Sequence, residues 1–200
     1  MVKPKKSSKI AYMLFEGETE EVFYQRVFSK YLYGVPQKID CLNGNLGINN
    51  KIIKRLSYFI NCNSSYNDIY VYVFLDRESY KAQKPDFNPT AIIKKLNSKY
   101  VNKIIKVEAV LMIESWFFYD IESICGYIGI TPTKSLLSRY NNPERLTAND
   151  LSDLFRKGTS KKYYRKGDES FQKILDIEKI YLGCSDLKSG IEKIINDFTF

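Results

Sequence analysis

Short apolar segments alternate with amphipathic helical segments through the first half of the chain, and this alternation limits the possible folds more than any other feature. Strands are expected at Lys9 to Phe15, Lys38 to Leu42, Asp68 to Leu75 and Lys103 to Leu111. The third of these, DIYVYVFL, is the strongest because it is rich in β-branched and aromatic residues. A helical pattern follows each of the first three. Such an order of strands and helices predicts a parallel, doubly wound sheet.

The second half of the chain lacks comparable strand patterns. After Glu114 the sequence predicts only short helices, around Trp116 to Ile124, Asn149 to Arg156, Ser170 to Ile177 and Asp186 to Phe198. We therefore expect an α/β protein with a Rossmann-like core at residues 8–113, in which helices flank a mainly parallel four-stranded sheet. A helical C-terminal lobe at residues 114–200 is expected to pack on this core. Two hundred residues suit one such unit better than two independent domains.

Several classes of protein are disfavoured by the composition. The longest apolar runs are far shorter than the roughly 20 residues that a membrane-crossing helix needs. The basic N-terminus is not followed by a typical secretory signal, so we expect a cytoplasmic protein. The four cysteines form no CxxC pair, and this pattern fits a reducing compartment. The chain has no histidine, which excludes Ser-His and Cys-His nucleophiles. A bound metal would have oxygen ligands, which suit Mg²⁺ and Mn²⁺.

Acidic residues follow three of the four predicted strands. Glu16 comes after the first strand, Asp76 and Glu78 come after the third, and Glu114 comes after the last. Ligands of open parallel sheets bind beyond the carboxyl ends of the strands, so these acids are expected to meet at one edge. Clustered carboxylates repel one another unless a cation or a raised pKa relieves the repulsion. A divalent cation is the simplest solution, although Asp76 alone would also fit an ordinary turn.

Three more acids lie in the first turn of the helix that follows the first strand. Carboxylates at this position stabilise a helix by interacting with its dipole. A structural role is therefore expected for Glu18 and Glu21, whereas Glu20 is equally compatible with a role in the acidic site.

The formal net charge of +8 is unevenly distributed, with nine Lys or Arg against three Asp or Glu between Lys134 and Lys166. A polyanion such as nucleic acid is one explanation, and a solvated surface that aids solubility is the other. Within this region, cations alternate with aromatic rings, as in grooves that contact phosphates and stack bases. The residues assigned to this nucleic-acid surface are Lys157, Lys161, Lys162, Tyr164, Arg165 and Lys166.

Three motifs resemble those of a known group of proteins. The segment FEGETEEVFY, which contains Glu16 and Glu20, resembles the first motif of the Toprim domains of OLD-family nucleases. The segment LDRESY resembles their DxD motif, with Glu78 in place of the second Asp. Glu114-Ser115-Trp116, with Asp120 further on, resembles the signature of small bacterial Toprim-like proteins such as the RloB-like group, which are often encoded beside ATPases. Asn142-Pro143-Glu144 and Tyr164-Arg165-Lys166 resemble these proteins more weakly.

The resemblance implies a Toprim-type nuclease that hydrolyses phosphodiesters of DNA or RNA with Mg²⁺ or Mn²⁺. It implies that Asp76 and Glu78 ligate metal, that Glu16 ligates metal or transfers a proton, and that Glu20 and Glu114 complete the shell. It also implies an effector of bacterial phage defence with an ATPase partner. Two alternatives stay open: a catalytically weak or inactive partner subunit, and a nucleic-acid-binding module that uses the basic C-terminal lobe.

Overall fold

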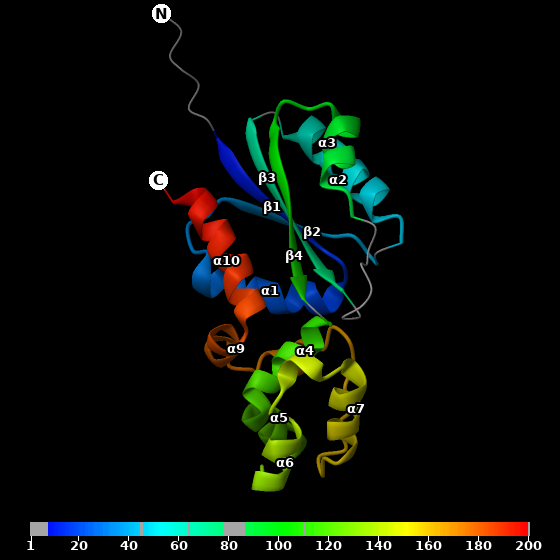
Figure 1. Ribbon diagram of the computed structural model, residues 1–200, viewed down its shortest axis with the longest axis vertical. Coiled ribbons are helices and arrows are strands. Elements are labelled where there is room, and N and C mark those ends of the chain that lie inside the picture. Colours follow the sequence, from blue (N-terminus) through cyan, green and yellow to red (C-terminus); the bar gives the residue numbers. More distant parts are fainter. Residues whose placement is uncertain (1–7, 45, 64, 78–86, 110, 200) are drawn as a thin grey trace, which may run out of the picture.

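The fold is built on a four-stranded sheet in which every strand is parallel to its neighbours (Figure 1). The computed structural model describes residues 8–44, 46–63, 65–77, 87–109 and 111–199. The strands are β1 (Lys9–Phe15), β2 (Gln37–Cys41), β3 (Asp68–Asp76) and β4 (Val101–Ala109), in the order β2-β1-β3-β4. Each begins and ends within two residues of its expected position, and the predicted α/β class is confirmed.

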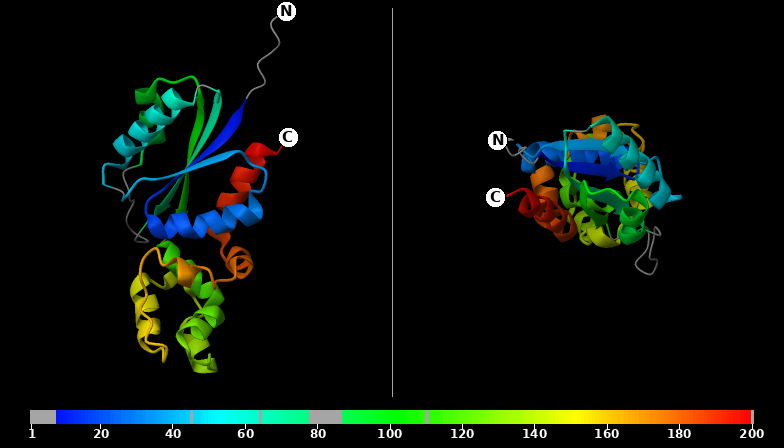
Figure 2. Two further views of the ribbon diagram at one scale, coloured as in Figure 1. Left: turned by 180° about the vertical axis from the view of Figure 1, so that it is seen from behind. Right: turned by 90° about the horizontal axis from the view of Figure 1, so that it is seen from above.

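Helices cover both faces of the sheet (Figures 1 and 2). One face packs against α2 (Ile48–Cys62) and α3 (Pro89–Leu96), and the other against α1 (Glu18–Tyr31) and α10 (Ser185–Phe198). Successive strand residues point to opposite faces, so Leu14 belongs to the core beside α2 while Phe15 belongs to the core beside α1. The apolar runs of β1 and β3 are continuous because both of their faces are buried.

A lobe of short helices follows β4 and lies below the carboxyl edge of the sheet in Figure 1. It comprises α4 (Ile113–Phe117), η1 (Phe118–Asp120), α5 (Ile121–Ile128), α6 (Lys134–Arg139), η2 (Pro143–Arg145), α7 (Ala148–Arg156), α8 (Glu169–Gln172) and α9 (Ile177–Gly183). The helix expected over Ser170 to Ile177 is divided, because the Asp176 side chain accepts the N–H groups of Glu178 and Lys179 and caps a new helix there. None of the helices in the described part of the chain has the length and apolar character needed to cross a membrane.

The last helix leaves the lobe and returns to the sheet. Near its C-terminal end, Asp197 accepts a hydrogen bond of 2.7 Å from the Tyr72 hydroxyl and forms an ion pair with Lys103. In its middle, Gly190 lies so close to β4 that a Cβ added there would be 2.5 Å from Cγ1 of Val107. The residues after β4 therefore form two parts, a lobe at the sheet edge and a helix that completes one face of the core.

The close approach of α10 to β4 gives a test of the packing. Replacement of Gly190 by Ala should destabilise the protein by about 1–3 kcal/mol, because the stiff Val107 side chain cannot turn away without disturbing the core. Gly126→Ala in α5 is the matched control, since nothing lies within 4 Å of a Cβ at that position. It should be neutral or stabilising by about 0.5–1 kcal/mol. Urea denaturation measures both effects, and equal stability of the two variants would contradict this packing.

Candidate functional site

A pocket of about 370 Å³ lies at the carboxyl edge of the sheet, where β1 and β3 end. In the strand order β2-β1-β3-β4, the chain continues from β1 to β2 at one edge of the sheet. From β3 it continues to β4 at the opposite edge. Ligands of open parallel sheets bind at such a switch point. The pocket is lined by Glu16, Gly17, Glu18, Thr19, Glu20, Asn43, Gly44, Asp76, Glu114 and Lys166. Four of the five acids predicted for the site are thus together, and the fifth, Glu78, lies outside the described residues.

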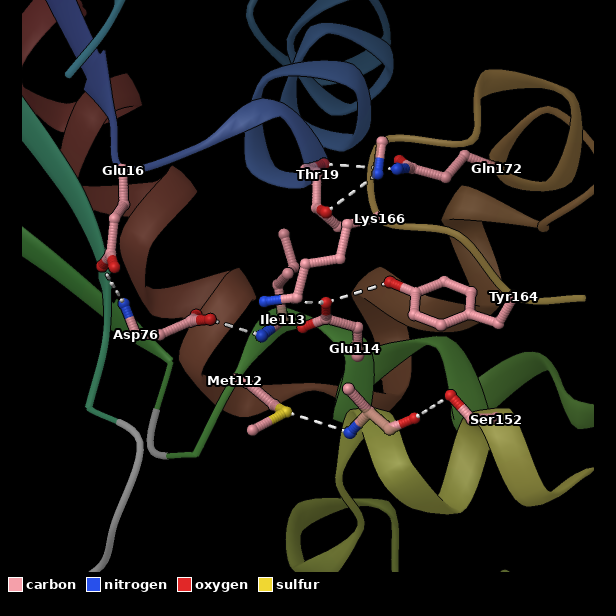
Figure 3. Close-up of polar contacts among 12 residues, drawn as sticks. Glu16, Thr19, Asp76, Met112, Ile113, Glu114, Ser152, Tyr164, Lys166 and Gln172 are labelled. Atoms are coloured by element: carbon pink, nitrogen blue, oxygen red, sulfur yellow. Dashed lines mark hydrogen bonds and ion pairs between the residues drawn. The ribbon is translucent and has the colours of Figure 1, made fainter. Parts of the chain in front are cut away.

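Glu16 and Asp76 occupy the ends of the two central strands (Figure 3). The backbone N–H of Asp76 donates to Oε2 of Glu16 over 3.4 Å, which links the residue after β1 to the last residue of β3. Asp76 is buried, and its Oδ1 accepts a hydrogen bond of 3.1 Å from the N–H of Ile113. Ile113 is the first residue of α4, which carries Glu114. Asp76 therefore connects β3 to α4, the helix that carries Glu114.

Glu20 reaches the pocket from the first turn of α1. Its side chain is buried, and a Cβ added at Gly17 would lie 3.2 Å from its Oε2. The absence of a side chain at Gly17 thus leaves room for this carboxylate beside the turn. The other two acids of the same turn differ: Glu18 is exposed at the rim of the pocket, and Glu21 does not line it.

Glu114 is held by residues of the C-terminal lobe (Figure 3). It is 1% exposed, and its Oε1 accepts a hydrogen bond of 2.9 Å from the Tyr164 hydroxyl. The ammonium group of Lys166 lies 4.0 Å from the same oxygen. The Tyr164 ring packs edge-on against Phe155 and Phe171, which fixes the position of its hydroxyl. The lobe therefore contributes directly to the acidic pocket.

The segment that carries Tyr164 and Lys166 is also fastened to α1. The N–H of Gly167 donates to the Thr19 hydroxyl over 3.1 Å, and the Gln172 amide donates to the Thr19 carbonyl over 3.4 Å. Gly167 has a φ of 70°, and a Cβ there would lie 3.2 Å from Cβ of Glu18, so only glycine fits this contact easily. Arg26, further along α1, donates to the carbonyl groups of Gln172 and Leu175. These contacts keep the lobe against the pocket.

The crowding of the acids changes their protonation. Burial, followed by the charges of Glu20, Glu114 and Glu16, raises the pKa of Asp76 well above its ordinary value. Burial, followed by the charges of Glu114 and Glu16, raises the pKa of Glu20 to about 7. Burial and the Glu114 charge also raise the pKa of the Tyr164 hydroxyl, so it remains a hydrogen-bond donor. The protein groups around the pocket thus do not fully stabilise the charged forms of its carboxylates.

The lining residues suit a hard divalent cation. Five carboxylates line the pocket, with Glu18 at its rim, and such oxygen ligands are those that Mg²⁺ and Mn²⁺ prefer. A bound cation would also relieve the repulsion that raises the pKa values of Asp76 and Glu20. In the arrangement seen here, no group of three Asp, Glu or Cys side chains within the described residues is close enough to hold a metal ion. Asp76 and Glu114 instead accept hydrogen bonds from protein groups.

Asn43 and Gly44 form one wall of the pocket, although neither belongs to the motifs that predict the site. The N–H of Gly44 donates to the Glu16 carbonyl over 2.7 Å and places this loop beside the acids. Lys51 donates to the carbonyl groups of both Asn43 and Gly44, at 2.7 and 3.0 Å. The Asn-Gly pair after β2 is the sequence signal for this turn, and both residues adopt the positive φ that such a pair favours.

Asp120, part of the resembled signature, serves a different site. It is buried, and its Oδ2 accepts a hydrogen bond of 2.6 Å from the N–H of Asp176 at the start of α9. Its Oδ1 lies 3.5 Å from the ammonium group of Lys179. These contacts attach α9 to η1, and Asp120 does not line the acidic pocket.

The six residues assigned to the nucleic-acid surface lie in one irregular segment between α7 and α8. Lys157 contacts the ring and hydroxyl of Tyr140, and Lys161, Lys162 and Arg165 are exposed. Lys166 reaches the pocket. The Tyr164 ring is partly buried and packs against Phe155 and Phe171 of the lobe.

Comparison of the chain with protein-family models, with curated proteins and with solved structures yields no match in any of the three.

The raised pKa of Glu20 predicts a pH-dependent stability. Below about pH 4.5 Glu20 is protonated in both the folded and unfolded states, and above about pH 7 it is charged in both. Between these values the folded state binds more protons, so the stability of the metal-free protein should fall as the pH rises toward 7. Glu20→Gln should therefore raise the Tm at pH 8 by about 2–10 °C, which corresponds to roughly 1–3 kcal/mol. Calorimetry at pH 5 and pH 8 measures the difference.

Glu21→Gln is the control for this measurement, because Glu21 lies on the same turn but outside the pocket. Its Tm should follow that of the wild type at both pH values. A Glu20→Gln variant less stable than the wild type at pH 8 would contradict the proposed repulsion.

The hydrogen bond between Tyr164 and Glu114 predicts unequal effects at two neighbouring tyrosines. Tyr164→Phe leaves a buried carboxylate oxygen without its donor and should lower the free energy of unfolding by about 1–3 kcal/mol. Tyr163→Phe removes a hydroxyl from an exposed ring and should change it by less than about 0.5 kcal/mol. Urea denaturation of both variants tests the contact, and equal effects would argue against it.

Proposed function

We propose that the protein is a divalent-metal-dependent nuclease of Toprim type that hydrolyses phosphodiester bonds in DNA or RNA. The observation that carries this proposal is the convergence of Glu16, Glu20, Asp76 and Glu114 on one pocket at the switch point of the sheet. These acids come from distant parts of the sequence, and their mutual repulsion has no evident structural benefit. An acidic pocket next to a basic segment is an arrangement suited to a metal ion and a polyanion.

The roles of the residues follow from their positions. Asp76, Glu16, Glu20 and Glu114 would hold Mg²⁺ or Mn²⁺, and Glu78 joins them by its place in the resembled motif. When bound, the metal would activate water and neutralise charge on the reacting phosphate. Glu16 would either ligate the metal or transfer a proton. Lys166, at the mouth of the pocket, would attract the phosphate.

A catalytically weak partner subunit is the second candidate. Asp76 and Glu114 accept hydrogen bonds from the Ile113 N–H and the Tyr164 hydroxyl, and within the described residues no three acids of the pocket are close enough to one another to hold a metal ion. This observation favours a site that a partner or substrate has to assemble. From the resemblance of the motifs we further propose a cytoplasmic protein that acts in phage defence together with an ATPase.

The metal site can be tested with two matched Asp→Asn substitutions. Asp76→Asn keeps an acceptor for the Ile113 N–H but removes the charge, so it should abolish Mn²⁺ binding in isothermal titration calorimetry. Asp153→Asn, on the exposed surface of α7, should bind Mn²⁺ as the wild type does. Equal affinity in both variants would exclude the acidic pocket as the metal site.

Nuclease activity is assayed on plasmid DNA, single-stranded DNA and total RNA in Mn²⁺. Glu16→Gln should reduce cleavage by about 100-fold or more. Cleavage that survives this substitution would come from another site or from a contaminant. Mn²⁺ binding without cleavage, followed by cleavage after addition of an ATPase partner, would support the second candidate.

A further inference from the structure

The segment from Lys161 to Lys166 has two rows of side chains. Lys162, Tyr164 and Lys166 contact the protein. The ammonium group of Lys162 lies 3.5 Å from the centre of the Tyr127 ring and donates to the Tyr127 carbonyl over 3.0 Å. Tyr164 and Lys166 both approach Glu114, as described above. This inner row fixes the course of the segment along the lobe and into the acidic pocket.

The outer row consists of Lys161, Tyr163 and Arg165. All three are exposed, and the Tyr163 side chain is 70% exposed. Within the described residues, none of these side chains forms a hydrogen bond or an ion pair, and the charge of Arg165 acts on the Asp168 carboxylate without a direct contact. The row places one aromatic ring between two cations on a backbone that the inner row holds in place.

We propose that this outer row binds a single-stranded polynucleotide, with an unpaired base stacked on Tyr163 and the adjacent phosphates near Lys161 and Arg165. The proposal rests on the proposed function and adds to it the strandedness of the substrate. An exposed aromatic ring binds a base through its flat face, and in a duplex the neighbouring base pairs cover that face. Of the two tyrosines in this segment, Tyr163 is the one assigned to stacking because it is exposed, whereas Tyr164 is partly buried.

The position of Tyr163, rather than its exposure, carries this inference. Tyr33 and Tyr58 are at least as exposed, at 95% and 72%, but neither lies in the segment that leads to the pocket. Tyr163 directly precedes Tyr164, whose hydroxyl contacts a pocket acid. A base stacked on Tyr163 would thus bring the nearby phosphodiesters to the mouth of the pocket beside Lys166. Single-stranded DNA and RNA share the required base faces and phosphates.

Fluorescence anisotropy with labelled oligonucleotides tests this inference. Single-stranded DNA, single-stranded RNA and duplex DNA of equal length are titrated with the full chain in EDTA, so that binding is measured without cleavage. Tyr163→Ala should weaken binding to at least one of the single strands by about 5- to 100-fold, as expected for loss of one stacked base. Duplex binding should change by less than about twofold, since phosphate contacts dominate it. Tyr163→Trp should restore single-strand binding.

Tyr58→Ala is the control, because it removes an equally exposed ring from α2. It should bind every oligonucleotide as the wild type does. The inference is overturned if the wild type binds no single strand, if Tyr163→Ala binds single strands normally, or if it loses duplex affinity to the same extent. The nuclease proposal fails separately: a chain that needs Tyr163 to bind single strands in EDTA but cleaves nothing in Mn²⁺ would retain this site without catalysis.

Discussion

Electrostatic repulsion among buried carboxylates is the constraint on which the arrangement of this protein depends. The parallel sheet brings Glu16 and Asp76 together at its carboxyl edge, and α1 and α4 add Glu20 and Glu114. Burial removes the water that would screen these charges, which is why the pKa values of Asp76 and Glu20 rise. Backbone N–H groups and the Tyr164 hydroxyl offset part of the repulsion. The packing of the lobe against α1 therefore helps to stabilise the charges in the pocket, because the lobe supplies the Tyr164 hydroxyl.

The sequence predicts the two central strands well because β1 and β3 are apolar on both faces, and DIYVYVFL is rich in β-branched and aromatic residues. It also predicts the meeting of the acids, because parallel strands end at one edge. It does not reveal the contacts that tie the lobe to the pocket, such as Gly167 with Thr19, since these join residues far apart in the sequence. Helix α6 is not predicted because it has only six residues and none of them is fully buried, so its apolar pattern is too short to recognise.

The irregular segment before α8 marks another limit of sequence interpretation. The composition of this segment, with its cations and rings, predicts a nucleic-acid surface, but a coil has no periodicity from which to infer which side chains face the protein. Tyr163 and Tyr164 are adjacent and chemically identical, and the contacts of Tyr164 with Phe155, Phe171 and Glu114 distinguish them. The sequence thus identifies the segment as a candidate, whereas tertiary contacts show which of its side chains are buried and which are exposed.

The return of α10 to the sheet has a consequence for how the polypeptide folds during synthesis. Gly190 of helix α10 packs against β4. Asp197 of the same helix accepts a hydrogen bond from Tyr72 and forms an ion pair with Lys103. This part of the sheet therefore stays uncovered on the ribosome until the residues of α10 have emerged, long after the strands themselves. Contacts over such sequence separations slow folding, so the exposed apolar surface of a nascent chain would persist and favour binding by chaperones.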